Sequence, residues 1–293
     1  MMNWQARQGF LGQESTDVLR NGRVGIVGLG GGGSHIAQQL AHIGVENFVL
    51  CDPDHYEDKN HNRTVGGTPA DVEAKTPKVR IAQRLIRDIN PKARVSAVKH
   101  RWQNALPFLR GCDAIFGCVD SYTERDQLER VSRRFLVPYI DIGMDVSKAE
   151  AGHAVHGQVV LSLPGGLCMH CFNFLRPELL ELEAQDYSQA GGRPQVIWPN
   201  GVLASTAVGL FIQLILPWHR DVCLGSVMYD YDGNRHTMIL SPRVSALSSV
   251  ACSHFDALEG EGDPFWNAGD AITPTMQAGV KILHPDSSTT SSI

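Results

Sequence analysis

The sequence predicts an α/β protein whose doubly wound, mostly parallel, Rossmann-like sheet is extended by antiparallel strands in the C-terminal half. Two observations lead to this class. Short apolar runs alternate with amphipathic helical segments as far as residue 142, and this alternation is typical of a parallel sheet covered by helices. A Gly-x-Gly-x-x-Gly segment also joins the first strand to the first covering helix, as in nucleotide-binding βαβ units.

The βαβ unit begins with the apolar run 24–27, which reads as a buried parallel strand. Apolar positions between 36 and 45 recur at helical spacing, and a second strand over 48–51 ends at Asp52. The glycines between strand and helix let the backbone approach phosphates at a helix N-terminus, where free N–H groups and the helix dipole favour negative charge. These glycines are Gly28, Gly30, Gly31 and Gly33.

The remaining elements of the first half follow from periodicity and from breaker residues. A small polar element (1–22) precedes the first strand, and a hydrophilic loop rich in proline and glycine (53–77) follows the second. Such a long loop lies where open α/β sheets bind their ligands, beyond the carboxyl end of a strand. The later elements are predicted as a helix over 78–90, strands over 94–98 and 113–119, a helix over 123–135 and a strand over 137–142.

The second half has a different character. Residues 153–163 and 226–240 read as longer, antiparallel strands, with a glutamate-rich loop (178–186) and an apolar helix (201–218) between them. That helix approaches the length of a membrane span, but its polar residues and Pro217 favour a helix buried in the core or in a subunit interface. We expect one continuous domain over 1–250, followed by an irregular segment (251–293) that ends in a disordered tail.

Composition limits the function. The formal net charge is −5 and the pI is about 6.2, so no broad basic surface favours nucleic acid or an anionic membrane. The N-terminus lacks an apolar signal core, and several of the seven cysteines lie in predicted buried strands. We therefore expect a cytoplasmic protein without disulfides.

Charged residues after the glycine loop indicate a triphosphate site rather than a hydride-transfer site. Asp52 suits a ribose hydroxyl. Arg63 and Lys78 can offset phosphate charge, the arginine through paired hydrogen bonds and the lysine as a point charge. Asp120, at the end of a later strand, can hold Mg²⁺, which prefers carboxylate and phosphate oxygens. No Walker sequence, Gly-x4-Gly-Lys-Ser/Thr, occurs in the chain.

The chain resembles the ThiF/MoeB/HesA proteins, the bacterial relatives of the ubiquitin-activating enzymes, from Arg7 to about Leu240. The motifs that carry the resemblance are Gly28-Leu29-Gly30-Gly31, Asp52-Pro53-Asp54, Asn60-His61-Asn62-Arg63, Thr76-Pro77-Lys78-Val79, Cys118-Val119-Asp120-Ser121 with Arg125, the Cys168/Cys171 pair and Pro199-Asn200-Gly201.

The resemblance implies Mg·ATP-dependent adenylation of a C-terminal carboxylate, usually the glycine tail of a small ubiquitin-like or sulfur-carrier protein. It also implies a homodimer in which Arg7 reaches the partner's ATP. The implied catalytic residues are Arg7, Arg63, Lys78 and Asp120, with Asp120 as the magnesium ligand. The implied nucleotide-binding residues are Gly28, Gly30, Gly31, Gly33, Asp52, Asp54, Asn60, Arg63, Lys78, Asp120, Ser121 and Arg125.

The chain departs from the family pattern in two places. Most relatives complete the Cys168/Cys171 pair with a second Cys-x-x-Cys, whereas this chain offers Cys252 and His254. A Cys3His zinc site is allowed, but the Cys-x-His spacing is tight, and a metal-free remnant is favoured. In addition, no cysteine occurs between Cys171 and Cys223, where the family often has its acceptor cysteine. Adenylation without an enzyme thioester is therefore the expected reaction.

Other functions fit parts of the pattern. A nicotinamide-dependent oxidoreductase can share the first βαβ unit. A non-catalytic scaffold that only binds a carrier is a second possibility, although Arg63, Lys78 and Asp120 are all present. The same adenylation chemistry can also act on a small peptide or on a tRNA base.

Overall fold

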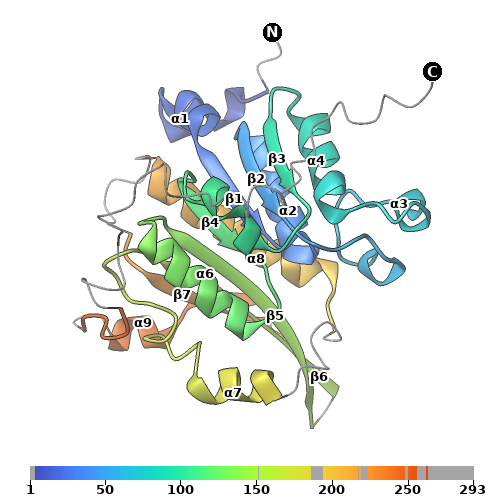
Figure 1. Ribbon diagram of the computed structural model, residues 1–293. Helices are drawn as coiled ribbons and strands as arrows, with labels where there is room; N and C mark the ends of the chain where they lie inside the picture. Colours follow the sequence, from blue (N-terminus) through green and yellow to red (C-terminus); the bar gives the residue numbers. More distant parts are fainter. Residues whose placement is uncertain are drawn as a thin grey trace, which may run out of the picture.

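One sheet organises the chain, as the computed structural model shows for residues 4–150, 152–185, 194–216, 218, 224–247, 250–255 and 262. Its eight strands lie in the order β3-β2-β1-β4-β5-β6-β7-β8. The pairs from β3 to β5 are parallel and those from β5 to β8 are antiparallel, which confirms the predicted fold class (Figure 1). The strands are β1 Arg23–Val27, β2 Asn47–Cys51, β3 Arg94–Val98, β4 Ala114–Gly117, β5 Tyr139–Ala149, β6 Gly152–Ser162, β7 Val227–Asp232 and β8 Thr237–Leu240.

Helices cover both faces of the sheet. α2, α4 and α8 pack on one face, and α5 and α6 on the other. The helices are η1 Ala6–Leu11, α1 Ser15–Asn21, α2 Gly31–Ile43, η2 Asp58–Asn60, α3 Pro69–Glu73, α4 Lys78–Ile89, η3 Trp102–Ala105, α5 Leu106–Leu109, α6 Tyr122–Arg134, α7 Pro177–Gln185, α8 Ile197–Ile215 and α9 Pro242–Ala246.

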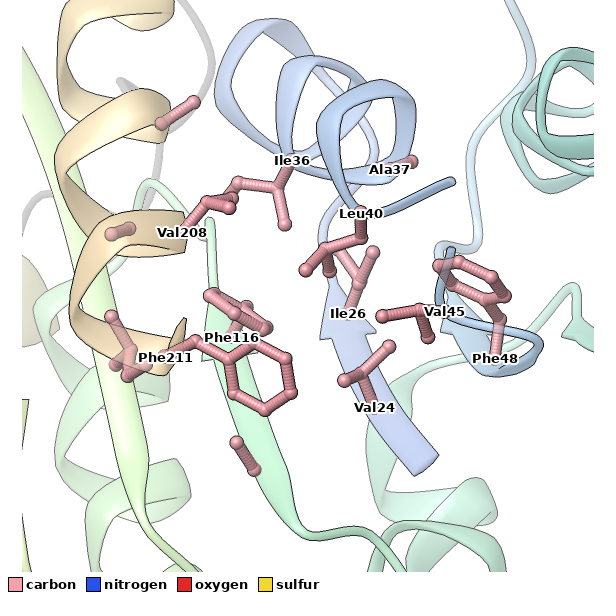
Figure 2. Packing of buried hydrophobic residues seen from close by; sticks show 14 of the residues in the cluster. Val24, Ile26, Ile36, Ala37, Leu40, Val45, Phe48, Phe116, Val208 and Phe211 are labelled. Atoms are coloured by element: carbon pink, nitrogen blue, oxygen red, sulfur yellow. The ribbon is translucent and has the colours of Figure 1, made fainter. Parts of the chain in front are cut away.

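The larger core lies between the sheet and α2, α4 and α8. Figure 2 shows Ile26 of β1 facing Leu40 of α2, and Phe116 of β4 facing Phe211 of α8. The two phenylalanine rings meet edge to face at 5.7 Å. Burying a side chain of this size stabilises a fold by about 1.5–3 kcal/mol, so these contacts hold α2 and α8, and hence the glycine loop between β1 and α2, against the sheet.

The second half differs from the sequence prediction in three elements. Residues 178–186 were expected to form a loop, but most of them belong to helix α7, because Pro177 suits the first helical position and the following leucines and glutamates favour a helix. The predicted strand 226–240 is the hairpin of β7 and β8. β5 continues beyond the predicted end at 142 because it pairs with β6 as far as Ala149.

Helix α8 begins at Ile197, before the predicted start, and takes in the Pro199-Asn200-Gly201 motif. By length and composition alone, α8 is apolar enough to cross a membrane, but it packs against α2, β5 and β6. Its interior position agrees with the expected core helix. Pro217, residues 186–193 and most of residues 251–293 lie outside the described residues.

Candidate functional site

The glycine loop lies where the carboxyl ends of β1, β2 and β4 meet. Gly28 has a positive φ of 86°, and a Cβ atom there would collide with the carbonyl of Cys118 at the end of β4. Gly31 opens α2 against the side-chain amide of Asn200, so a side chain at this position would displace the Asn200 amide. The glycines therefore hold β1, β4, α2 and α8 in close contact and leave the first turn of α2 without side chains, which suits a phosphate ligand.

Asp52 ties the end of β2 to the glycine loop. Its carboxylate accepts hydrogen bonds from the backbone N–H groups of Leu29 at 2.6 Å and Asp54 at 2.8 Å. The residue is buried, and burial raises the pKa of Asp52, although the charge of Lys78 and the two N–H bonds act against this shift. The predicted ribose ligand thus also orders the loop, because a buried carboxylate needs such partners.

Lys78 and Asp54 form an ion pair beside Asp52. Lys78 Nζ lies 2.7 Å from Asp54 Oδ2, and the backbone N–H of Lys78 donates to the Asp54 carbonyl. The lysine side chain is largely buried whereas the Asp54 side chain is mostly exposed. The two Lys78–Asp54 contacts therefore hold the Lys78 ammonium group close to Asp52 and the glycine loop. From there Lys78 can exchange Asp54 for a phosphate as its partner.

The loop between η2 and α3 carries Asn60 and Arg63. Asn60 is buried, and its side-chain oxygen accepts the N–H of Glu57 in a capping box. The Arg63 guanidinium donates to the Lys59 carbonyl and to Asn62. Asn60 thus shapes the turn that presents Arg63, whereas direct contact of Asn60 with nucleotide remains a prediction.

Gln195 joins this loop to Asp120. Its carbonyl accepts the side-chain amide of Asn62 at 3.0 Å, and its own side-chain amide donates to Asp120 Oδ1 at 3.1 Å. Asp120 is exposed at the end of β4, next to the glycine loop. The contacts therefore place the Arg63 loop and Asp120 on either side of one site.

Ser121 is the N-cap of α6, and its hydroxyl accepts the N–H of Glu124. The same hydroxyl donates to Glu183 of α7 at 3.0 Å, and the Glu183 carboxylate also accepts the N–H groups of Tyr122 and Thr123. These bonds lower the pKa of Glu183, although burial opposes this shift. Glu183 therefore fixes the first turn of α6 and with it the neighbouring Asp120.

Arg125 lies beneath this turn. Its guanidinium is buried, donates to the Val119 carbonyl at 2.7 and 3.1 Å and lies 3.6 Å from Asp141. Burial raises the pKa of Asp141 to about 6, against the lowering by Arg125. Arg125 thus supports the strand end that carries Asp120, and its predicted contact with nucleotide stays a prediction.

Arg7 lies apart from these residues. It is exposed in η1, and its neighbours Gln5 and Gln8 donate to the carbonyl of Ile43 at the C-terminal end of α2. The glycine loop is at the other end of that helix, roughly 18–20 Å away at 1.5 Å per residue. Arg7 therefore lies at the end of α2 that is far from the glycine loop of its own chain.

Four side chains that the sequence offered as possible metal ligands lie together. The ligand atoms of Cys168, Cys171, Cys252 and His254 are all within 4.8 Å of one another. The two sulfurs of the pair are 3.5 Å apart, and His254 Nδ1 lies 3.6 and 3.4 Å from them. Zinc–sulfur and zinc–nitrogen bonds of about 2.3 and 2.0–2.1 Å place tetrahedral ligands at such separations, so the set fits zinc despite the tight spacing.

This cluster is anchored to α6. Glu129 is buried and accepts the Ser162 hydroxyl at 2.6 Å and the N–H of Met169, inside the cysteine pair, at 3.0 Å. His170 lies 2.7 Å from Asp126, and its ring stacks on His254. The cluster and the glycine-loop site thus share α6, the cluster along its side and Asp120 just before its beginning.

Cysteines beside the glycine loop are poor nucleophiles. Burial raises the pKa of the Cys51 thiol and of the Cys118 thiol far above the usual range. Cys168 is buried in the cluster of possible metal ligands. A thiolate, which is the reactive form, is therefore disfavoured at these positions.

The structure brings most of the predicted residues to one sheet edge, and it adds residues that the prediction left out. Asn200 belonged to a quoted motif but was not assigned to the site. Glu183 and Gln195 were not predicted because they reach Ser121 and Asp120 only in the folded chain. They lie on either side of residues 186–193 in the sequence, and no motif around them indicates a role in the site. The residues brought together are Gly28, Gly30, Gly31, Gly33, Asp52, Asp54, Asn60, Arg63, Lys78, Asp120, Ser121 and Arg125.

Comparison with known proteins identifies a family whose sequence model matches most of the chain. The profile of the ThiF family matches residues 3–253. The SAMP-activating enzyme E1 of Haloferax volcanii is 30% identical over 170 residues, which are 57% of this chain and 59% of that protein. The molybdopterin-synthase adenylyltransferase of Salmonella typhimurium is 32% identical over 221 residues, which are 74% of this chain and 82% of that protein.

A solved structure supports the fold. Escherichia coli MccB with ATP has a TM-score of 0.66 to this chain at 19% sequence identity, and the match covers 82% of this chain and 71% of MccB. At this identity the likeness concerns the fold. The chain spans less than two thirds of the length of the Haloferax relative, so activity has to be argued from the site.

Proposed function

The chain belongs to the ThiF family, and we propose that it is an ATP-dependent adenylyltransferase that activates the C-terminal carboxylate of a ubiquitin-like or sulfur-carrier protein. One observation carries the proposal: the glycine loop, Lys78, Arg63 and Asp120 surround one sheet edge, and Asn62 and Gln195 connect its two sides. Relatives named as adenylyltransferases or as an E1 enzyme support the reaction class.

In this reaction the substrate carboxylate attacks the α-phosphorus of ATP, and pyrophosphate leaves. Little proton transfer is needed, so catalysis consists mainly of alignment and of balancing phosphate charge. Lys78 and Arg63 supply fixed positive charge, and the first turn of α2 supplies N–H donors. Asp120 would hold Mg²⁺, which neutralises phosphate charge when bound.

The adenylate is the expected end of this chain's own chemistry. A thioester step needs a reachable thiolate, and burial disfavours the thiolates of Cys51 and Cys118. We infer that the acyl-adenylate passes directly to another molecule. The direct test is whether a carrier's C-terminal carboxylate, but not the corresponding amide, becomes linked to AMP when this chain and Mg·ATP are added.

The other functions considered fit less well. Lys78, Arg63 and Asp120 around the glycine loop would have no task in hydride transfer, and a non-catalytic scaffold would not need charges poised at a nucleotide site. A small peptide or a tRNA base remains a possible acceptor of the same adenylyl chemistry. The relatives named as adenylyltransferases or as an E1 enzyme favour a carboxylate at the end of a protein tail.

A homodimer is part of the proposal. Trp198 and Val202 are apolar residues of α8 whose side chains are exposed. Exposed apolar surfaces often bind a partner. Arg7 is distant from its own glycine loop, because its neighbours Gln5 and Gln8 are bound to the far end of α2. Both features agree with a second copy that receives Arg7 in its nucleotide site.

The cysteine cluster is proposed to hold a structural zinc ion. Cys168, Cys171, Cys252 and His254 would bind it, because three thiolates and one imidazole at tetrahedral separations form a closed site. Zinc bound there would link the segment around Cys252 to the loop that Glu129 anchors on α6.

The purified protein should contain roughly one zinc per chain. Cys171→Ser and His254→Ala should lose that zinc and melt at a lower temperature, because the ion crosslinks two distant segments. Metal analysis and thermal unfolding measure both effects. His153→Ala, which changes an exposed histidine on β6, should keep both values. If the wild-type protein contains no zinc after it has been refolded in the presence of zinc, the assignment is contradicted.

A further inference from the structure

A narrow cleft leads away from Asp120 along the face of the sheet that α6 covers. Six of its lining residues are Asp120, Arg125, Gly143, Asp145, Gln158 and Gln195. A side chain at position 143 would collide with the Arg125 guanidinium and the Gln158 amide, so this wall of the cleft requires a glycine.

The charged residues in this cleft differ in whether they already have partners. Arg125, its cation, is buried and already bound by Asp141 and by the Val119 carbonyl. Asp145 is exposed and forms no ion pair with any residue that the structure describes. Since the charge of Asp120 would be used by magnesium, the carboxylate of Asp145 is the charge left to face a substrate.

The strands beside Asp145 carry two further aspartates, of which Asp232 is already paired with Arg235 at 3.8 Å and accepts the N–H groups of Asn234 and Arg235. In the register of the sheet, Asp145 of β5 is paired with His156 of β6, which is paired with Asp232 of β7. One step nearer to Asp120, Gly143 is paired with Gln158, and Gln158 with Asp230. Paired positions point to the same face, so three aspartates lie on the face that bears the cleft, where β5 and β6 extend past the parallel strands (Figure 1).

We propose that Asp145 selects the substrate: the tail that enters this cleft carries a lysine or arginine a few residues before its C-terminus, and Asp145 binds that cation. The proposal rests on the proposed function, because it assumes that the carboxylate to be activated lies at the Asp120 end. With the terminal carboxylate there, upstream residues of the tail lie over Gly143 and then beside Asp145. This arrangement defines a basic, glycine-ended tail as the substrate class.

The spacing of strand residues limits where the basic residue is. Gly143 and Asp145 are two residues apart, or roughly 6–7 Å along a strand. A tail that runs beside β5 advances at the same rate, so the cation is expected roughly three to five residues from the C-terminus. Positions nearer to the end face Gly143 and need to be small.

Heptapeptides that end in Gly-Gly test this inference. Each carries Arg, Gln or Glu at the third, fourth or fifth position from the C-terminus, and they compete for limiting enzyme with Mg·ATP. Mass spectrometry counts each peptidyl-AMP, and the fluorescence anisotropy of dye-labelled copies measures binding. Wild-type protein should prefer Arg over Glu at one position by roughly two- to five-fold at low salt, as expected for an exposed ion pair, and less at high salt.

Two variants decide whether Asp145 is responsible. Asp145→Lys should reverse the preference at that position, and Asp145→Asn should remove it. Glu150→Lys makes the same change of charge at the exposed turn of the β5–β6 hairpin and should keep the wild-type preference. An unaltered preference in Asp145→Lys, or an equal loss in Glu150→Lys, would overturn the inference. If no peptide is adenylated but the Asp145-dependent binding preference persists, the proposed reaction fails while the recognition of a basic tail stands.

Discussion

Replacing Lys78 with alanine is expected to reduce ATP–pyrophosphate exchange by about 10²-fold or more, the scale observed when one preorganised charge-stabilising group is removed. Lys78 Nζ is held 2.7 Å from Asp54, and its charge acts on Asp52, which binds the glycine loop through the N–H of Leu29. Arg63→Ala, on the opposite side of the site, should give a loss of the same order. Isotope exchange into ATP measures both.

Folding should change much less than activity in these variants. Asp54 is mostly exposed, and ion pairs with one such partner contribute about 0.2–1 kcal/mol, so the melting temperature of Lys78→Ala should fall by less than about 4 °C. Lys92→Ala, which removes an exposed lysine just beyond α4, should leave exchange unchanged. Wild-type exchange in both Lys78→Ala and Arg63→Ala would refute the assigned phosphate site.

The second large effect is expected at Asp120. Asp120→Asn keeps an oxygen that can accept the hydrogen bond from Gln195, but it removes the negative charge that Mg²⁺ needs. ATP should still bind through the glycine loop, whereas turnover falls by about 10²-fold and more magnesium is required for half-maximal exchange. A magnesium titration of the exchange reaction measures this shift.

A matched variant separates the local effect from a change of net charge. Asp88→Asn alters an exposed residue of α4 in the same way and should give the wild-type magnesium curve. If the titration of Asp120→Asn coincides with that of the wild type, Asp120 is not the magnesium ligand.

The parallel half of the fold and the centre of the site follow from short-range patterns. Apolar runs, breakers and glycine spacing placed β1, α2 and β2. Charged residues beyond strand ends placed Asp52 and Asp120, because parallel strands bring their carboxyl ends to one edge, and Lys78 was placed by its position at the start of the helix that follows the loop after β2. Those signals lie within a few residues of each element, so the sequence alone is sufficient to find them.

Long-range contacts account for what was missed. The continuation of β5 to Ala149 depends on pairing with β6, and the polar sequence Asp145-Val146-Ser147-Lys148 carries no strand signal of its own. Glu183 and Gln195 reach the site only after the chain has folded back over α6. His254 likewise approaches Cys171, 83 residues away in the sequence, which spacing rules for paired ligands do not cover.

The most direct test of the account is to incubate the chain and Mg·ATP with a carrier protein whose tail ends in Gly-Gly. Intact-mass spectrometry should show the carrier joined to AMP at its C-terminal carboxylate, with none on the C-terminal amide, and a non-reducing gel should show no enzyme–carrier adduct. An adduct that disappears with dithiothreitol and with one Cys→Ala change would contradict the reaction proposed here, and the absence of AMP transfer to any carboxylate-ended tail would contradict the adenylyltransferase assignment itself.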